Sequence, residues 1–289
     1  MLGGIEAGGT KFVCAVASAP DRILARERIP TTTPAATLAQ VTAFFRAHGA
    51  GLTALGLAAF GPLDLDPASP SFGALRATPK PGWSGVPLMA PLQRALGVPV
   101  RVQTDVVGAA LAEWRLGAAR GHRAVLYLTV GTGIGGGALV DGVPVQGRGH
   151  AELGHVRVPR APGDSFAGCC PFHGDCLEGL AAGPALAARC GVAADQLPAD
   201  HPVWDAVAHY LAHALAGYAL VLAPDVIVAG GGVLQTPGLL ARVLPRLRAE
   251  LDRYPVHPAW RDLARFLVPP ALPEPGLTGA LLLAAQAAP

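Results

Sequence analysis

Two β-hairpins with glycine-rich turns, one in each half of the chain, are the feature that most limits how this sequence can fold. In the first half, residues 3–7 and 11–17 read as short strands around the turn Gly8-Gly9-Thr10. In the second half, the apolar strand 124–130 enters "GTGIGG" (131–136) and continues as another strand. Further predicted strands and helices alternate after each hairpin. We therefore expect an α/β protein whose two halves repeat one plan.

The remaining elements are predicted from apolar spacing and from the glycines and prolines at their ends. Predicted helices cover residues 36–48, 107–117, 202–222, 237–251 and 276–287, and further strands are expected within 52–64, 98–106, 224–233 and 264–268. The segment "TPKPGWSGVP" (78–87) is predicted to be a long loop that exposes Trp83.

Length and charge limit the classes of fold and partner. A chain of 289 residues suggests two domains, which we expect at 1–106 and 107–273, with a last helix (274–289) returning to the first domain. Hydrophobic residues make up 51% of the chain and its net charge is +2, which argues against disorder, a nucleic-acid partner or an anionic membrane surface. The sequence shows neither a leader nor an apolar run that could span a bilayer, so we expect a cytoplasmic protein.

Three glycine-rich turns predict a nucleotide-binding cleft. They are Gly8-Gly9-Thr10-Lys11, the run from Gly131 to Gly137, and Gly230-Gly231-Gly232. Glycine lets the backbone approach a phosphate closely, and successive N–H groups form a concavity that binds anions. Lys11 adds a positive charge, and the only other lysine of the chain is Lys80. A single turn of this kind is usually only a turn, but two such hairpin turns, one in each half, and a third glycine triplet after a buried strand together favour phosphate binding.

Cysteine and histidine gather in "AGCCPFHGDC" (167–176). The spacing Cys170-x-x-His173-x-x-Cys176, together with His155 upstream, offers four ligands for a closed tetrahedral site, which is the preference of structural zinc. The alternatives are a loop of unrelated polar residues and a redox role for the adjacent pair Cys169 and Cys170. Five cysteines, an odd number, do not indicate a disulfide framework.

Asp105 is the candidate general base. It ends a predicted buried strand, where active sites of α/β proteins tend to form, and a helix follows it. The same position suits a helix N-cap, and the residues alone favour neither role. Glu6, before the first turn, is a second candidate: it either orients a water on Mg²⁺ or lies on the surface of a strand edge.

The motifs together resemble the ROK family of sugar kinases, and specifically its fructokinase branch. The resemblance rests on "GGIEAGGTKFVCAV", "TPKPGW", "TDVVGAALAEW", "GTGIGGGALVDG", "HAELGHVRV" and "CLEGLAAGPA", which occur in the family's order along essentially the whole chain. It implies an actin-like (ribonuclease H-like) two-domain fold, with ATP and sugar meeting in an interdomain cleft. It also implies Mg²⁺, a structural Zn²⁺ and a homodimer.

The resemblance assigns roles residue by residue. The nucleotide is expected at Gly8, Gly9, Thr10, Lys11, Gly131, Thr132, Gly133, Pro184, Gly230, Gly231 and Gly232. Asp105 is expected to be the catalytic base, and the sugar is expected at Thr104, Glu152, His155 and Glu178. The zinc ligands are expected to be His155, Cys170, His173 and Cys176, with Cys170 chosen over Cys169. The family often has asparagine next to the base, where this chain has Val106 and Val107.

The sequence therefore predicts an ATP-dependent fructokinase that forms fructose 6-phosphate. One alternative is a broader hexokinase acting on mannose or glucose, because the sequence does not show the shape of the sugar pocket. Another is a non-catalytic sugar-binding regulator; such relatives carry a DNA-binding segment before the first glycine turn, which begins here by Glu6. His209 and His213 have a metal-capable spacing on a predicted helix, but they lack the glutamate of H-E-x-x-H and are expected to be solvated.

Overall fold

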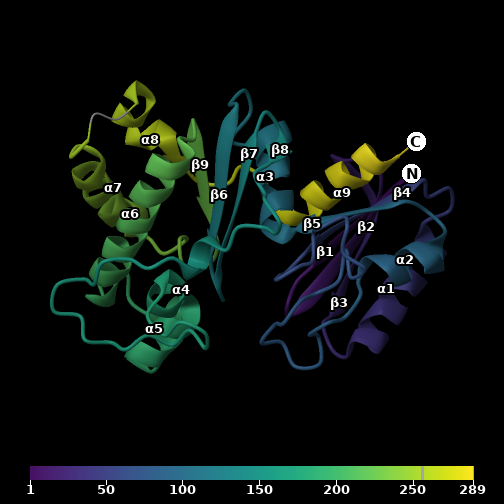
Figure 1. Ribbon diagram of the computed structural model, residues 1–289, viewed down its shortest axis with the longest axis horizontal. Coiled ribbons are helices and arrows are strands. Elements are labelled where there is room, and N and C mark those ends of the chain that lie inside the picture. Colours follow the sequence, from purple (N-terminus) through teal and green to yellow (C-terminus); the bar gives the residue numbers. More distant parts are fainter. Residues whose placement is uncertain (255–256, 289) are drawn as a thin grey trace. The chain divides into compact units, whose positions relative to one another are not determined.

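The computed structural model describes residues 1–254 and 257–288, and the chain forms two compact units (Figure 1). Unit 1 comprises Met1–Arg120, Gly142–Ala151 and the segment from Ala271 onward, and unit 2 comprises Gly121–Asp141 and Glu152–Pro270. The chain therefore passes from one unit to the other four times.

Unit 1 is built on a five-stranded sheet with the order β3-β2-β1-β4-β5. Its strands are β1 (Leu2–Ala7), β2 (Lys11–Ala19), β3 (Arg22–Pro30), β4 (Ala54–Ala59) and β5 (Val100–Thr104). The first three strands form an antiparallel meander, and β4 and β5 add to it in parallel with β1. The predicted first hairpin is therefore present, with Glu6 opposite Val13 and Ala7 opposite Phe12.

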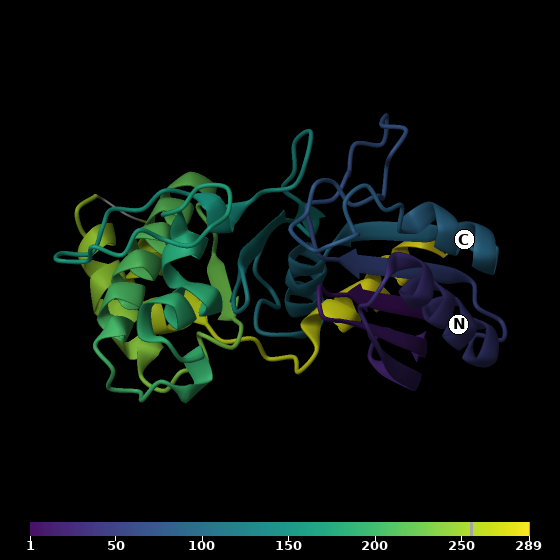
Figure 2. The same ribbon diagram turned by 90° about the horizontal axis from the view of Figure 1, so that it is seen from below.

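Helices cover both faces of this sheet: α1 (Pro34–His48), α2 (Met89–Leu96), α3 (Asp105–Leu116) and α9 (Pro275–Ala287) (Figure 2). Two adjacent glycines of β1 point to opposite faces, as neighbours in a strand must. A Cβ on Gly3 would lie 2.9 Å from the ring of Phe45 in α1, and one on Gly4 would lie 2.8 Å from Leu281 in α9. At Gly56 of β4 the backbone of α9 is so close that a Cβ would lie 1.8 Å from the carbonyl oxygen of Ala280. Small residues thus let α9 pack directly on the sheet.

The expectation that Trp83 is exposed was wrong, because its side chain is fully buried. The loop folds back over the unit 1 core, where the indole ring lies 5.6 Å from Phe12 and 6.0 Å from Phe60, measured between centroids. Its Nε1 donates a hydrogen bond of 2.9 Å to the carbonyl of Thr32. Glycine and proline indicate a loop, but they do not reveal whether that loop carries an anchoring side chain.

Unit 2 contains a second five-stranded sheet with the order β10-β9-β6-β7-β8. Its strands are β6 (Ala124–Val130), β7 (Ile134–Val140), β8 (Val143–Pro144), β9 (Val226–Gly230) and β10 (Leu267–Val268). The predicted second hairpin is β6 with β7, and β9 and β10 continue the sheet in parallel with β6. The helices are α4 (Leu177–Ala181), α5 (Gly183–Cys190), α6 (Val203–Leu222), α7 (Leu239–Leu251) and α8 (Leu263–Phe266).

Several elements differ from the sequence-based expectation. The strands β3 and β8 and the helices α2, α4 and α5 were not predicted, and most of the expected strand 264–268 is the short helix α8 followed by β10. The expected division at residue 106 assigned residues 107–117 to the second domain. In the structure α3 packs along α9 and against β4, within unit 1.

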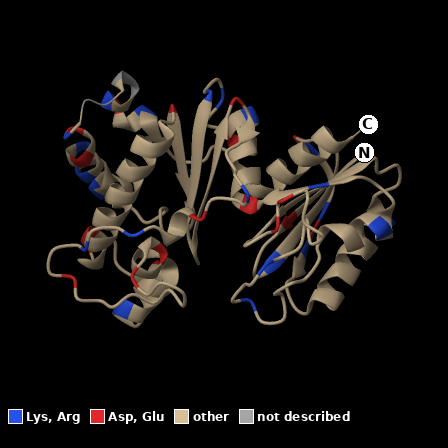
Figure 3. Ribbon diagram, viewed as in Figure 1, with Lys and Arg blue, Asp and Glu red and all other residues tan. Residues whose placement is uncertain are grey.

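Charged residues of both signs are interspersed on each unit (Figure 3). Helix α9 carries none, which suits its burial against the sheet. Among the described residues, no helix combines the length and the apolar character needed to cross a membrane.

Candidate functional site

Hydrogen bonds at its base fix the conformation of the first glycine turn. The Gly8 N–H donates to the Lys11 carbonyl at 2.9 Å and closes the hairpin. From the end of β3, Thr31 braces the turn: its Oγ1 donates to the Gly8 carbonyl at 2.7 Å, and its N–H donates to the Thr10 carbonyl at 3.0 Å. A Cβ on Gly9 would meet no atom within 4 Å, and Thr10 and Lys11 are exposed. The turn therefore presents backbone, a hydroxyl and an ammonium group to solvent, as a phosphate site requires.

Glu6 is only partly exposed, and its strand β1 lies in the centre of the sheet rather than at an edge. Its side chain packs against Gly276, where a Cβ would lie 2.6 Å from Glu6 Oε1, and it accepts a hydrogen bond from the Leu277 N–H. Burial raises the pKa of Glu6, and the neighbouring Glu274 adds to the rise, while Lys11 opposes it. The carboxyl group thus joins the end of β1 to the first turn of α9.

Thr104 and Asp105 lie next to each other at the start of α3, but their side chains make different hydrogen bonds there. Thr104 is the N-cap: its Oγ1 accepts from the Val107 N–H at 3.3 Å, and the residue is 3% exposed. Asp105 is therefore the first residue of the helix rather than its cap. Its Oδ1 accepts from the Val106 N–H at 2.9 Å, and the residue is partly exposed. Thr104 therefore caps the helix, and Asp105 begins it with a partly exposed side chain.

The second and third glycine turns lie side by side in unit 2. The Gly131 N–H donates to the Gly133 carbonyl at 2.9 Å, and Gly232 N would lie 3.9 Å from a Cβ on Gly131. Gly231 has a φ of +97°, and a Cβ there would lie 2.4 Å from the Val130 carbonyl oxygen, so this close approach requires glycine.

The N-terminus of α5 meets the same place. The Gly183 N–H donates to the Gly131 carbonyl at 2.8 Å, and Pro184 follows it as an exposed residue of the first helical turn. The structure thus brings together three segments for which a nucleotide-binding role is predicted: the turn at Gly131, the turn at Gly230–Gly232 and Pro184.

Glu178 links the second turn to the cysteine-rich loop. It lies in the first turn of α4, and its Oε2 accepts from the Ile134 N–H at 2.8 Å. A Cβ on Gly133 would lie 2.8 Å from the same oxygen. Glu152 is exposed and precedes a short 3-10 helix (Leu153–His155), in which the His155 N–H donates to the Glu152 carbonyl at 3.1 Å. Glu178 and His155 both lie within unit 2, at the two ends of the segment 155–178.

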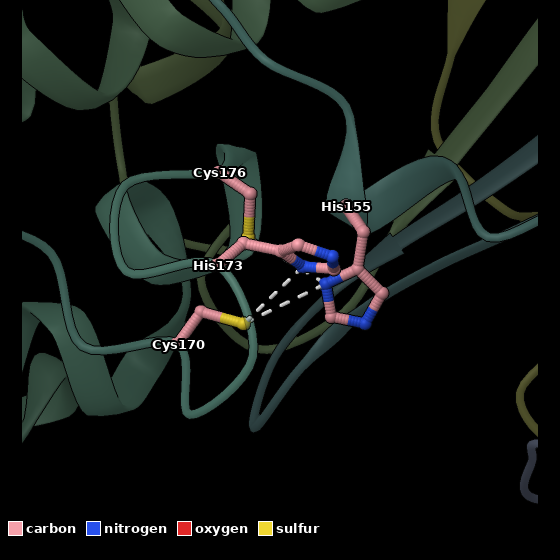
Figure 4. A group of neighbouring side chains, drawn as sticks. All are labelled: His155, Cys170, His173 and Cys176. Carbon is pink, nitrogen blue, oxygen red and sulfur yellow. Dashed lines mark hydrogen bonds between the residues drawn. The ribbon is translucent and has the colours of Figure 1, made fainter.

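The four predicted metal ligands converge in unit 2 (Figure 4). The ligand atoms of His155, Cys170, His173 and Cys176 all lie within 4.8 Å of one another. Cys170 Sγ lies 3.7 Å from His155 Nδ1 and 3.8 Å from His173 Nδ1, and Cys176 Sγ lies 3.5 Å from His155 Nδ1. A tetrahedral zinc ion with bonds of about 2.3 Å to sulfur and about 2.0 Å to nitrogen would place such atoms roughly 3.3–3.8 Å apart. The donor set and its spacing therefore fit zinc.

The loop that carries these ligands is shaped by backbone hydrogen bonds. Cys170 and Gly174 exchange two of them, at 3.0 and 2.9 Å, and Cys176 is the N-cap of α4. A Cβ on Gly179 would lie 1.9 Å from the Gly174 carbonyl oxygen, so only glycine fits. Cys169 is exposed and lies outside the cluster. Burial raises the pKa of the Cys176 thiol to about 11, so a bound cation is needed to hold it as thiolate at neutral pH.

Several residues that organise the site lie outside the motifs. Thr31 has no motif around it, and only the pairing of β2 with β3 brings it to the first turn. Asp164 accepts two hydrogen bonds from the guanidinium of Arg189, at 2.8 and 2.7 Å, and one from the hydroxyl of Tyr210. This nearly buried group ties the segment before the cysteine-rich loop to α5 and α6. No sequence signal marks it, because the three residues are far apart in the chain.

His209 and His213 stack at 4.1 Å between ring centroids on α6. The His209 ring hydrogen-bonds to the carbonyl of Pro159, and the His213 ring hydrogen-bonds to the carbonyl of His209. His213 also pairs with Glu250. Neither belongs to a group of candidate metal ligands among the described residues. Burial, and then the neighbouring His213, lower the pKa of His209.

A two-unit α/β protein in which a hairpin with a glycine turn lies in each sheet has the actin-like (ribonuclease H-like) fold of sugar kinases, as predicted. The sequence matches the ROK family over residues 2–287, and the chain belongs to that family.

Two relatives and one solved structure cover nearly the whole chain. The fructokinase of Zymomonas mobilis is 43% identical over 99% of this chain and 97% of its own, and that of Pediococcus pentosaceus is 40% identical over 99% and 98%. The crystal structure of the ROK hexokinase from Thermus thermophilus has a TM-score of 0.81 and 32% identity, covering 99% of this chain and 98% of that one.

Proposed function

We propose that this protein is an ATP-dependent fructokinase that transfers the γ-phosphoryl group of ATP to the 6-hydroxyl of D-fructose, with fructose 6-phosphate and ADP as products. The observation that carries the proposal is the similarity to named fructokinases at 40% and 43% identity over nearly the full chain. The exposed glycine turns and the position of Asp105 support the same chemistry.

Asp105 is proposed as the general base. It accepts the proton of the 6-hydroxyl while that oxygen attacks the γ-phosphorus and the bond to the β-phosphate oxygen breaks. Its Oδ1 already accepts the Val106 N–H, which holds the carboxylate in one orientation without neutralising it. Thr104 contributes by capping the helix, which positions Asp105.

The phosphates are proposed to bind at the glycine turns. Lys11 and the N–H groups of the first turn compensate the negative charge of the phosphates, and the turns at Gly131 and at Gly230–Gly232, with Pro184, contact the nucleotide. Mg²⁺ bound with ATP supplies further charge compensation, as phosphoryl transfer generally requires.

The sugar is proposed to bind Glu152, His155 and Glu178, whose acceptor atoms suit hydroxyl groups. A structural Zn²⁺ held by His155, Cys170, His173 and Cys176 fixes the orientation of the His155 ring and of the helix that carries Glu178. We also propose that the protein is cytoplasmic and forms a homodimer, as the family resemblance implies.

A broader hexokinase is the second candidate, and the observation that favours it is the similarity to the Thermus thermophilus hexokinase. The identity of 32% to that protein is lower than the identity to either fructokinase, so we rank fructose first. A non-catalytic regulator would leave the retained Asp105 and Lys11 without a function.

A coupled assay of ADP release with MgATP tests the proposal against fructose, mannose and glucose. We compare the wild type with Asp105→Asn, which keeps an oxygen for the Val106 N–H, and with the exposed Asp195→Asn as a matched control. We expect turnover on fructose that falls about 10²- to 10⁴-fold in Asp105→Asn only. Preference for glucose or mannose would overturn the substrate, and no turnover of any sugar by a folded, zinc-containing protein would overturn the kinase.

A further inference from the structure

The two lysines of the chain lie on different segments of unit 1, and both connect to the first glycine turn. Lys11 belongs to the turn itself. Lys80 lies in the loop that contains Trp83, and its Nζ lies 3.3 Å from the carbonyl oxygen of Thr31. Thr31 is the residue that holds Gly8 and Thr10 in place.

Trp83 makes a second contact beside the first. Its Nε1 donates to the carbonyl of Thr32 at 2.9 Å, so two neighbouring carbonyls receive donors from the same loop. The spacing of the donors comes from a tight turn, in which the Trp83 N–H donates to the Lys80 carbonyl at 3.2 Å. Pro81 and Gly82, with a φ of +77° at the glycine, suit the two central positions of a type II turn.

These contacts are partly sheltered from solvent. Trp83 is fully buried and Thr31 is 8% exposed, while Lys80 is partly buried and Thr32 is exposed. Hydrogen bonds in such surroundings are stronger than exposed ones and are costly to leave unmade. Lys80, Trp83, Thr31 and Thr32 therefore form one connected group, which we call the latch.

We propose that Lys80 and Trp83 are positioning residues for phosphoryl transfer, which act through Thr31 and Thr32 to hold the first glycine turn in the conformation that binds phosphate. The inference rests on the proposed function for its consequence in catalysis. Gly8 and Gly9 give the turn close approach to phosphate but also make it flexible when free. The latch orders the turn before the nucleotide arrives, so less ordering is left for binding to impose.

The test compares Lys80→Met, Lys80→Arg and Trp83→Phe with the exposed Arg94→Met, which removes a positive charge elsewhere in unit 1. Lys80→Met loses the donor to Thr31, whereas a guanidinium at that position can still donate to it. Phenylalanine keeps the ring beside Phe12 and Phe60 but has no donor for Thr32. Steady-state kinetics give kcat and the two KM values, calorimetry gives the affinity for ADP, and hydrogen exchange reports on residues 8–11.

In Lys80→Met we expect the KM for MgATP to rise about tenfold, because one charged hydrogen bond is lost. The affinity for ADP should fall by the same factor, and the KM for fructose should not change. Exchange at residues 8–11 should accelerate, Lys80→Arg should recover most of the ADP affinity, and Trp83→Phe should show a smaller loss of the same kind. Arg94→Met should match the wild type.

Unchanged ADP affinity and exchange in Lys80→Met would overturn the latch. A rise confined to the KM for fructose would also overturn it, and would make Lys80 a direct sugar ligand. If the wild type turned over no sugar, the proposed function would fail, but ADP affinity and exchange would still decide the latch because neither needs a sugar.

Discussion

Glu178 supports the second glycine turn and is also proposed to bind the sugar. One carboxylate oxygen accepts the Ile134 N–H and so supports the second glycine turn, while the family resemblance places the same group on the sugar. An ionised carboxylate has about four acceptor positions, so both contacts can be made together. The residue also follows the proposed metal ligand Cys176 by two positions, so its hydrogen bond to the Ile134 N–H connects the cysteine-rich loop to the second glycine turn.

Substitutions at Glu178 should separate its two contacts. Glu178→Gln keeps an oxygen for Ile134 but removes the charge, and Glu178→Ala removes both. We expect kcat/KM for fructose to fall in both variants by about 10- to 100-fold, because hydrogen bonds to charged groups are strong. ADP affinity, measured by calorimetry, should fall only in Glu178→Ala. Equal ADP affinity in Glu178→Ala and wild type would show that the bond to Ile134 does not support the turn.

At this scale the sequence predicts well where spacing is local. Cys170, His173 and Cys176 lie on one short loop, and the structure brings them together with His155. The pattern C-x-x-H-x-x-C favoured Cys170 over Cys169, but ligand chemistry alone could not separate them, because adjacent cysteines differ only in the direction that the loop's hydrogen bonds give them. The capping role of Thr104 was missed for a similar reason, since it depends on where α3 begins to within one residue.

The start of α3 gives a prediction at the scale of the element. Thr104→Val should lower the free energy of unfolding by about 1 kcal/mol through loss of the N-cap, whereas Thr104→Ser keeps the acceptor and should match the wild type. Because the Thr104 hydroxyl already accepts a hydrogen bond from the Val107 N–H, the KM for fructose should not change in either variant. Denaturant unfolding and sugar kinetics measure the two effects. A raised KM without loss of stability in Thr104→Val would instead make Thr104 a sugar ligand.

The group formed by Asp164, Arg189 and Tyr210 should make the packing of α5 and α6 sensitive to acid. The Arg189 guanidinium holds the pKa of Asp164 well below its usual range, and Tyr210 assists, while burial opposes both. A carboxyl with a lowered pKa in the folded state stabilises fully above its unfolded pKa of about 3.9, and this contribution is lost as pH falls below that value.

Asp164→Asn should therefore be destabilised most near neutral pH, by about 3 kcal/mol, because Arg189 is left nearly buried without its anion. The difference from wild type should shrink as the pH is lowered from 5 to 3. Denaturant titrations across that range measure it, with the exposed Asp195→Asn as control. A difference that stays constant with pH would mean that the ion pair does not contribute as the geometry indicates.

Strand β3 and helix α2 were missed because their apolar pattern is weak, whereas the mostly buried helix α4 was missed because it is only five residues long. Most side chains of β3 are exposed, and its sequence "RILARERIP" carries four charges, so only its pairing with β2 makes it a strand. Helix α2 buries a single residue, Leu92, and contains a proline near its start. By contrast β6, whose side chains are mostly buried, was predicted with its observed bounds.

At the scale of the molecule, the chain has two separate large cores. One is formed by residues of unit 1, including Phe12, Phe45 and Trp83, and the other by residues of unit 2, including Trp204 and Tyr210. Length and the doubled hairpins were enough to predict two domains. The sequence could not show that α3 stays in unit 1, because its partner α9 is more than 150 residues away.

Two cores and one candidate metal site predict that removing the proposed metal destabilises only part of the molecule. The cluster lies in unit 2, so a chelator should lower the unfolding temperature of unit 2 and leave that of unit 1 unchanged. A site filled at roughly a thousand times its dissociation constant contributes about 4 kcal/mol, which corresponds to about 10 °C for a unit of this size.

The tryptophans allow the two transitions to be followed separately, because Trp83 and Trp114 lie in unit 1 and Trp204 and Trp260 in unit 2. Variants that keep one pair, with phenylalanine at the other two positions, should show the chelator's effect only through Trp204 and Trp260.

Cys170→Ser should contain no zinc and should behave like the chelated protein. Cys169→Ser should retain about one zinc per chain by elemental analysis, because Cys169 lies outside the cluster. A single transition that shifts equally for both pairs would show that the metal stabilises the whole molecule. Zinc lost from Cys169→Ser but kept in Cys170→Ser would reverse the assignment of the ligand.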